Sequence, residues 1–391
     1  MLLSIALILL LGMMMGWICK KAHLPGLIGM LMTGIMLGPY ALNLIDASIL
    51  GISAELRKIA LIIILTRAGL SLDLEDLKRV GRPAILMCFV PACFEILGMV
   101  FLAPKLLGVS VVDAAVMGAV VGAVSPAVIV PKMLRLMEEG YGTQKSIPQM
   151  ILAGASVDDV FVIVLFTAFT GLAQGESVSV KSFAEIPVSI ILGIAAGLAV
   201  GCGLAVFFEK VHIRDTSKVM IVLCVSFLLV TLEEQAGEVI PFASLLAVMA
   251  MGIALQKKRE VVAGRLSVKF NKLWSVSEIL LFVLVGATVD LRYALSAGGM
   301  VIVLLFGVLF FRMIGVWLCL WRTGLNWRER LFCMIAYMPK ATVQAAIGGI
   351  PLAMGLSCGE LVLTVAVAAI LVTAPLGAFL MELTYQKLLS R

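Results

Sequence analysis

Long apolar runs, separated by short polar connections, follow one another along the whole chain. Each run approaches the roughly 20 residues that an α-helix needs to cross the hydrocarbon core of a bilayer. The pattern predicts an all-α polytopic membrane protein with about 13 transmembrane helices. The expected spans are residues 2–18, 24–42, 55–72, 83–103, 112–135, 147–171, 186–208, 218–233, 240–256, 271–289, 298–321, 329–353 and 361–383.

The composition leaves little room for a soluble domain. The 391 residues are 62% hydrophobic and 14% charged, with a mean hydropathy of +1.13, whereas a soluble domain carries roughly 25% charged residues. We therefore expect residues 1–391 to form a single membrane-embedded unit, which excludes a nucleic-acid-binding protein and a soluble enzyme. The cysteines lie mostly in apolar runs, and the two histidines have no metal-ligand spacing, so we expect no cofactor.

Basic residues gather on one side of the predicted membrane. Most of the 30 Lys and Arg residues lie in or beside connections that follow odd-numbered spans, whereas Glu233, Glu234 and Glu238 lie at or after the end of an even-numbered span. Lys and Arg concentrate in cytoplasmic loops. We therefore expect the N-terminus outside and the C-terminus in the cytoplasm, and we interpret the net charge of +6 as a topology signal.

Two predicted helices, residues 112–135 and 329–353, are interrupted by helix-breaking residues at similar depth. They are seven spans apart, so they run in opposite directions and permit an inverted repeat. Unpaired backbone inside a membrane is tolerated only where it lines a cavity or is covered by protein. Two broken helices that cross therefore predict a site near the bilayer midplane. The interrupting residues are Pro126, Pro131, Pro339, Gly348, Gly349 and Pro351.

Three acids and two bases lie near the middle of predicted spans: Glu95, Asp158, Asp159, Arg312 and Lys340. A charge at the centre of a membrane helix costs roughly 2.5 to 3.5 kcal/mol, so five unpaired charges would cost on the order of 15 kcal/mol. Two bases can neutralise two acids. The remaining carboxylate must hold a proton or bind a cation, and a site that alternates between the two is a proton/cation exchanger. The sequence leaves open which of the two adjacent aspartates is unpaired.

Five segments carry a family resemblance: LTRAGLSLD at 65–73, VPACFE at 90–95, VSPAVIVP at 124–131, ASVDD at 155–159 and MPKATVQAA at 338–346. The chain resembles the cation/proton antiporter superfamily in its paired-aspartate branch and is most similar to the NHA-type sodium/proton antiporters. The resemblance implies that Asp159 binds Na⁺, Li⁺ or the proton, and that Asp158 is its partner and pairs with Lys340. It also implies that Glu95 pairs with Arg312. Many of these antiporters have a lysine where this chain has Arg312, which cannot release a proton.

The resemblance also implies the sodium/proton antiporter fold, in which a core moves against a scaffold. The implied core is residues 83–171 and 298–383, and the scaffold, which usually dimerises, is residues 1–72 and 218–289. Residues 186–208 would link the two. The expected protein is a multi-pass homodimer of the cell membrane whose partners are lipid, monovalent cations and protons.

Four polar residues lie beside the predicted breaks or the aspartate pair: Ser125, Ser156, Thr342 and Gln344. Their side chains could donate oxygens to a dehydrated Na⁺ or Li⁺, or they could satisfy the backbone of the broken helices. The sequence leaves both roles open.

The function that we expect is secondary active exchange of Na⁺ or Li⁺ for H⁺ by elevator-like alternating access. The alternative is an Na⁺-coupled symporter of an organic anion, which has a similar architecture but lacks the paired aspartates. A passive cation channel is disfavoured because the sequence shows no filter-like repeat. An enzyme is not expected, because no HExxH or GxSxG arrangement occurs.

Overall fold

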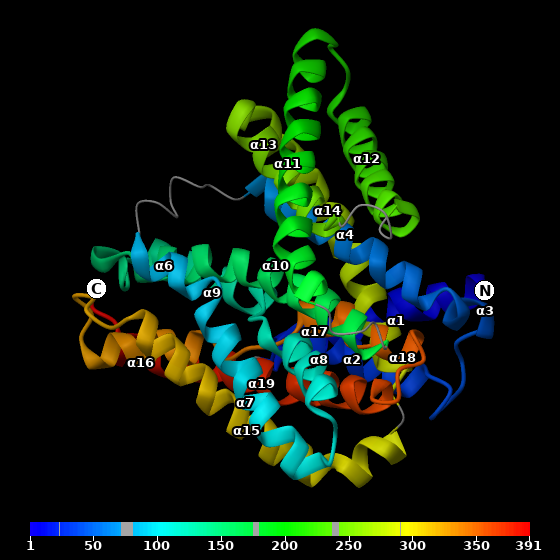
Figure 1. Cartoon of the computed structure of the whole chain (residues 1–391), viewed down its shortest axis with the longest axis vertical. Coiled ribbons are helices and arrows are strands. Elements are labelled where there is room, and N and C mark those ends of the chain that lie inside the picture. The colour runs from blue at the N-terminus through cyan, green and yellow to red at the C-terminus, as the bar shows by residue number, and fades with distance from the viewer. Residues whose placement is uncertain (23, 72–80, 175–179, 237–241, 290) are drawn as a thin grey trace. The chain divides into compact units, whose positions relative to one another are not determined.

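The computed structural model describes the chain except residues 23, 72–80, 175–179, 237–241 and 290 (Figure 1). Every regular element in the described ranges is helical. The α-helices are α1 (Leu2–Lys21), α2 (Gly26–Leu37), α3 (Ala47–Gly51), α4 (Ser53–Ser71), α6 (Arg82–Met87), α7 (Val90–Leu107), α8 (Val111–Gly122), α9 (Pro126–Glu139), α10 (Ile147–Ala173), α11 (Val180–Lys210), α12 (Asp215–Ala236), α13 (Ser244–Lys258), α14 (Glu260–Ala287), α15 (Leu291–Cys319), α16 (Trp327–Ala336), α17 (Thr342–Ile347), α18 (Ile350–Ala353) and α19 (Gly359–Leu388). A short 3₁₀-helix, η1, covers Thr143–Lys145.

Eight helices of the described chain are long and apolar enough to cross a membrane. This number is smaller than the expected set of about 13 spans, because some of the expected spans consist of shorter helices in the structure. The apolar helices Gly26–Leu37, Val111–Gly122 and Thr342–Ala353 have fewer than 18 residues each. The last two border the expected breaks, and a helix that stops part-way is shorter than the bilayer core.

The chain divides into two compact units. The first consists of Met1–Leu56, Glu75–Gly175 and Ile279–Arg391, and the second of Arg57–Leu74 and Glu176–Glu278. All five ionisable residues expected inside the membrane belong to the first unit. The geometry of the candidate site is therefore set within this unit.

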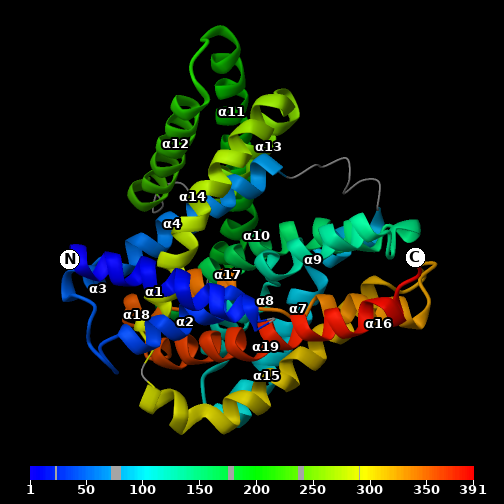
Figure 2. The same cartoon turned by 180° about the vertical axis from the view of Figure 1, so that it is seen from behind.

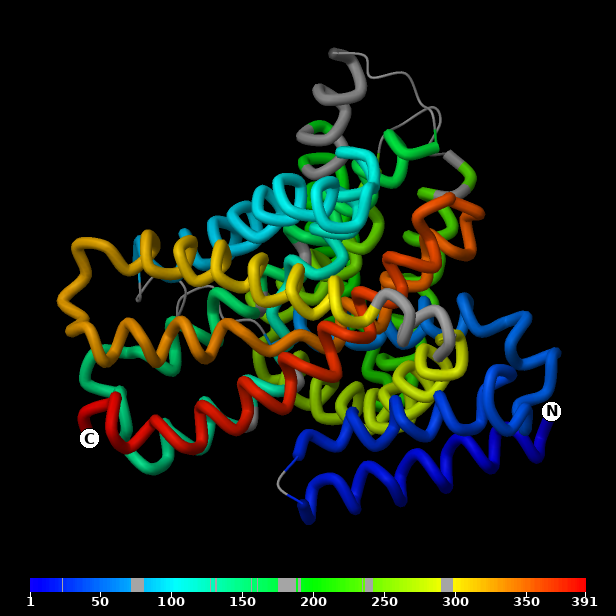
Figure 3. The backbone as a smooth tube through the Cα atoms, turned by 90° about the horizontal axis from the view of Figure 1, so that it is seen from below, coloured from blue at the N-terminus to red at the C-terminus, as the bar shows by residue number. Residues whose placement is uncertain are grey.

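Helices from both halves of the sequence interleave in the first unit. α7 packs against α15 and α8, α10 packs against α8, and α16 runs along α19 (Figures 1 and 2). α1 and α2 form an antiparallel pair, visible as the dark blue hairpin in Figure 3. The contacts of α15 with α7 and of α19 with α8 bring residues more than 200 positions apart in the sequence together.

Both expected interruptions are present, at slightly different positions. α8 ends at Gly122, and α9 begins with Pro126 as its first residue and continues through residue 131. Proline is well tolerated at the first turn because that N–H has no helical partner. The second interruption separates α16 from α17 over residues 337–341, and a further turn at residues 348–349 separates α17 from α18.

Glycines set the helix spacing in the second unit. The small-residue spacing of Gly193, Gly197 and Gly201 indicates close helix contacts, and all three lie where α11 packs against α13. A Cβ atom at Gly197 would lie 2.2 Å from the carbonyl oxygen of Ala247. Only the absence of a side chain allows the two backbones to approach this closely.

We expect Gly197→Ala to destabilise the protein by about 1 to 3 kcal/mol, because overpacking forces the helices apart. Gly203 is the matched control: it lies in the same helix, and nothing lies within 4 Å of its would-be Cβ. Gly203→Ala should leave the stability unchanged or raise it by up to about 1 kcal/mol. Thermal unfolding of the purified variants measures both effects, and equal melting temperatures for the two would contradict the packing argument.

Candidate functional site

The two helix breaks lie against each other in the first unit. The backbone N–H of Ser125, in the first break, donates to the carbonyl oxygen of Pro339, in the second, at 2.8 Å. Ala123 and Ser125 are extended, so neither can continue the helical hydrogen-bond pattern. The two broken segments therefore pair with each other through their main chains.

Side chains satisfy the backbone groups that the first break frees. The carbonyl oxygen of Gly122 accepts from Nη1 of Arg312, and that of Ala123 accepts from Nε2 of Gln344 at 2.9 Å. The N–H of Val124 donates to Oδ2 of Asp158 at 2.8 Å. An unpaired backbone group in the hydrocarbon region costs several kcal/mol. These three side chains replace the missing turn of helix.

The second break is satisfied in the same way. The carbonyl oxygen of Tyr337 accepts from Nε of Arg312 at 2.6 Å, and the N–H of Lys340 donates to Oγ1 of Thr373 at 2.9 Å. Arg312 thus binds backbone carbonyls of both breaks. Its guanidinium has five N–H donors in a fixed plane, which lets one side chain serve several acceptors.

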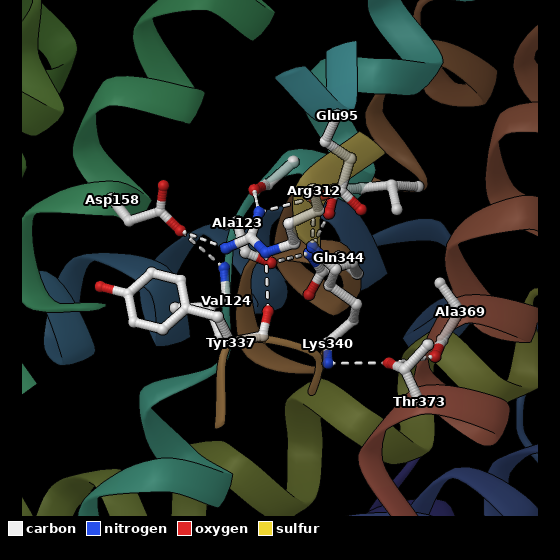
Figure 4. A network of polar contacts seen from close by, with 12 residues as sticks. Glu95, Ala123, Val124, Asp158, Arg312, Tyr337, Lys340, Gln344, Ala369 and Thr373 are labelled. Atoms are coloured by element: carbon white, nitrogen blue, oxygen red, sulfur yellow. Dashed lines mark hydrogen bonds and ion pairs between the residues drawn. The ribbon is translucent and has the colours of Figure 1, made fainter. Parts of the chain in front are cut away.

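A chain of four buried charges runs through the site (Figure 4). Arg312 Nη1 lies 2.6 Å from Oε2 of Glu95, and Nη2 lies 3.0 Å from Oδ2 of Asp158. Nζ of Lys340 lies 2.5 Å from the same Glu95 oxygen. All four side chains are at most 1% exposed. We call these residues the charge network; its two acids and two bases sum to zero.

One of the two expected ion pairs is present, and the prediction of the other is wrong. Glu95 pairs with Arg312, but Lys340 pairs with Glu95 and not with Asp158. Asp158 binds Arg312 and the Val124 N–H instead. The expectation of two separate pairs treated each base as a single point charge, whereas the planar fork of an arginine can hold two carboxylates.

Asp159 stands outside the charge network. Among the described residues it forms no ion pair, and its Oδ1 is buried without a hydrogen-bond partner. It is 9% exposed, whereas Asp158 is fully buried. Adjacent residues on a helix point about 100° apart, so Asp158 can face Arg312 while Asp159 faces elsewhere. The carboxylate in excess is therefore Asp159.

The polar residues expected beside the breaks divide between the two roles. Gln344 satisfies backbone through its amide nitrogen, while its Oε1 has no partner among the described groups. The hydroxyl oxygens of Ser125 and Thr342 are also buried without a partner there. The side chain of Ser156 lies outside the described part of the structure. Three neutral oxygens beside the breaks thus remain available as ligands.

Two residues of the site had no clear signal in the sequence. Thr373 is one of three threonines in the apolar helix α19, and it accepts from Lys340 N while donating to the carbonyl of Ala369. Tyr337 directly precedes the MPKATVQAA segment, and its ring lies 5.4 Å from the Arg312 guanidinium carbon. The position of Tyr337 at the edge of a predicted break was the one available hint.

The chain matches the family described as "Sodium/hydrogen exchanger, transmembrane" over residues 5–382. The chain belongs to the sodium/hydrogen exchanger family. It is 32% identical to sodium/hydrogen exchanger 9B2 of Mus musculus, over 94% of this chain and 69% of that protein. The human 9B2 protein is 33% identical over 94% of this chain and 70% of its own length, and human 9B1 is 31% identical over 94% and 73%.

The fold of this exchanger-family chain is similar to that of a protein whose structure has been solved. The structure of the sodium proton antiporter MjNhaP1 from Methanocaldococcus jannaschii at pH 8 superposes with a TM-score of 0.87 and 19% sequence identity. The superposition covers 99% of this chain and 98% of that one. At this identity the likeness shows the fold alone, and the fold is that of an antiporter.

Several expectations from the sequence are confirmed by family membership. The chain is a multi-pass protein of the cell membrane and a member of the cation/proton antiporters, a family of transporters and not of enzymes. Its placement in the paired-aspartate branch stays a prediction that depends on Asp158 and Asp159.

Removing the central guanidinium should destabilise the folded protein strongly. In Arg312→Ala, Glu95 keeps Lys340, but Asp158 loses its base and two carbonyls lose their donor. Breaking a buried ion pair costs about 3 to 5 kcal/mol. The control is Arg135→Ala, whose half-exposed side chain pairs with Glu139 and Glu382 and should contribute at most about 1 kcal/mol. Thermal unfolding of the reconstituted variants distinguishes the two, and a similar small loss for both would refute a central role for Arg312.

Proposed function

We propose that the chain exchanges Na⁺ or Li⁺ for H⁺ by elevator-like alternating access, with Asp159 as the shared binding site. One observation carries this proposal: of the five ionisable residues expected near the middle of the membrane, four neutralise one another, and Asp159 is the fifth. A buried carboxylate without a base is stable only with a proton or a cation bound. Competition between the two ions for one carboxylate couples their movements.

The surroundings of the breaks support a site for a small dehydrated cation. Na⁺ and Li⁺ are hard cations, which prefer oxygen ligands over nitrogen or sulfur. Ser125, Thr342 and Gln344 each present a buried oxygen without a protein partner. We propose that some of these oxygens join Asp159 when the cation is bound.

The charge network favours one proton per monovalent cation. Asp158 binds a guanidinium and a backbone N–H, both of which stabilise its ionised form. Arg312 stays protonated in proteins, and Lys340 is matched by Glu95. We propose that Asp159 alone changes its charge during the cycle. We therefore propose electroneutral exchange.

The remaining expectations about architecture belong to the same proposal. We propose about 13 spans in an inverted repeat, with the N-terminus outside and the C-terminus in the cytoplasm. Residues 83–171 and 298–383 would form the moving core, residues 1–72 and 218–289 the dimerising scaffold and residues 186–208 the linker. The basic connections after odd-numbered spans support this orientation.

Asp159→Asn should abolish exchange while the protein still inserts into the membrane. An amide neither takes up a proton near neutral pH nor neutralises the charge of a cation. The measurement is proton flux in proteoliposomes driven by Na⁺, Li⁺ or K⁺ gradients. The control is Asp113→Asn, an acid at the start of α8 that is hydrogen-bonded to Ser110 and lies outside the charge network; it should retain activity. We expect the native rate to fall at acid pH, where protons occupy Asp159. Full activity of Asp159→Asn would rule out this site.

The same assay separates the other transport classes. Cation uptake that needs an organic anion and moves no protons outward would indicate the symporter. Failure of an Na⁺ gradient to drive protons uphill would indicate a channel.

One proton per cation predicts exchange that is insensitive to membrane potential. The Na⁺ gradient that just balances a given pH gradient should be the same with the potential clamped at zero and at about −100 mV. One net charge moved across the membrane would be worth about 2.3 kcal/mol at that potential. A balance point that shifts by that amount would show that a second proton is carried, and Lys340 or Asp158 would then have to titrate.

A further inference from the structure

Thr373 is a fully buried threonine of α19 whose hydroxyl joins this helix to the second break (Figure 4). Its Oγ1 donates to the carbonyl oxygen of Ala369 at 2.7 Å and accepts from the backbone N–H of Lys340 at 2.9 Å. Thr364 and Thr384, in the same helix, also donate to the carbonyl four residues before them. Threonines in helices commonly form this bond. In the described part of the chain, only Thr373 among the three also accepts from another segment.

One face of α19 carries the second break. Positions 366, 373 and 377 lie on the same side of the helix, because they are separated by seven and four residues. A Cβ atom at Gly377 would lie 2.5 Å from Cγ of Pro339, and a Cβ atom at Gly348 would lie 2.7 Å from Cβ of Ala366. Thr373 lies between these two close contacts and adds a hydrogen bond to them. The helix therefore fixes the break both by packing and by this one polar contact.

The two breaks are held at equivalent positions. Val124 lies two residues before the start of α9, and its N–H donates to Oδ2 of Asp158. Lys340 lies two residues before the start of α17, and its N–H donates to Oγ1 of Thr373. Thr373 thus does for the second break what Asp158 does for the first. Because its hydroxyl is neutral, Thr373 can act on the site only through the position of the main chain.

The second break leads directly into two of the oxygens that are candidates for binding the cation. Thr342 is the first residue of α17, and its hydroxyl oxygen is buried without a partner among the described residues. Gln344 follows one position further on, and its Nε2 donates to the carbonyls of Val121 at 3.3 Å and Ala123 at 2.9 Å. This leaves its Oε1 buried and unpaired within the described chain. The positions of both oxygens depend on where the main chain of Lys340 is held.

We propose that Thr373 is a positioning residue that sets the selectivity of the site among alkali cations. By holding the main chain of Lys340, it fixes the end of the second break and so places the oxygens of Thr342 and Gln344 at distances that suit Na⁺ and Li⁺. The inference rests on the proposed function, in which such oxygens bind the cation together with Asp159.

The direction of the effect follows from the size of the ions. Selectivity between cations of different size depends on the size of the cavity and on the number and flexibility of its ligands. Li⁺ is smaller than Na⁺ and needs its oxygens closer. A buried N–H that loses its acceptor is costly, so the break should shift until that group finds another partner. A loosened break should therefore weaken the binding of Li⁺ more than that of Na⁺.

The test is Na⁺-driven and Li⁺-driven proton flux in proteoliposomes containing the full chain with Thr373→Val, measured over a range of cation concentrations at one pH. Valine keeps the branched shape but lacks the acceptor. We expect the KM for Li⁺ to rise about two- to tenfold relative to the KM for Na⁺, the factor to which one hydrogen bond corresponds. Where the chain takes only one of the two ions, a rise in the KM for that ion is the expected result. A loss of folded protein would lower the maximal rate and leave KM unchanged.

Two variants in the same helix are the controls. Thr373→Ser keeps the acceptor for Lys340, so its KM values should stay close to the native ones. Thr364→Val removes a buried hydroxyl whose one hydrogen bond in the described structure goes to the carbonyl of Glu360, and its KM values should also stay native. The controls separate the loss of this acceptor from the loss of any threonine hydroxyl.

Gly377→Ala displaces the break by a different route and leaves the Thr373 hydroxyl in place. The added methyl group would meet the ring of Pro339 at 2.5 Å, and this ring is part of the main chain of the break. We expect the ratio of the two KM values, or the single KM, to change by about twofold or more. This variant decides the question if Thr373→Val does not fold.

The outcomes separate the inference from the proposed function. Unchanged KM values in Thr373→Val, the same change in Thr373→Ser or Thr364→Val, or unchanged KM values in folded Gly377→Ala would overturn the role of Thr373, even though Asp159→Asn is inactive. If the native chain exchanges neither Na⁺ nor Li⁺ for protons, or if Asp159→Asn retains full exchange, the proposed function itself is refuted.

Discussion

The structure of the site depends on one requirement: the backbone N–H and C=O groups that are freed where a helix breaks must find hydrogen-bond partners. Two helices stop inside the first unit, and their freed N–H and C=O groups lie where water cannot compensate them. The structure meets this requirement with side chains from α10, α15, α17 and α19 and with one main-chain bond between the breaks. Arg312 is central because it alone binds carbonyls of both breaks among the described residues.

The charge balance is a consequence of that requirement. A guanidinium that binds carbonyls needs counter-charges at the same depth, and Glu95 and Asp158 supply them. Asp158 is therefore chiefly a structural residue: one of its oxygens replaces a helical carbonyl for Val124 and also neutralises Arg312. This leaves Asp159 as an acid outside the charge network, which is why we propose that its charge follows the transported ions.

The sequence predicted which residues form this site better than it predicted how they pair. The prolines and glycines at 126, 339 and 348–349 marked the two breaks, and the excess of one acid over the bases could be counted. The partner of Lys340 could not be inferred, because it depends on how far the Arg312 fork reaches in three dimensions. Thr373 is one of three threonines in α19, and Tyr337 caps α16; both were missed because neither position stands out in the sequence until the helix beside it is known.

The location of these contacts bears on how access to the site can alternate. Every hydrogen bond and ion pair that holds the breaks joins residues of the first unit. Opening the breaks to let an ion pass would expose several backbone groups and two buried ion pairs at once, each costing kcal/mol in the membrane. Moving the proposed core, residues 83–171 and 298–383, as one body would disturb none of them, because both partners of each contact belong to it. The cost of breaking the charge network therefore supports the cycle that we propose, in which the site is carried intact between the two sides and Asp159 alone changes its occupant.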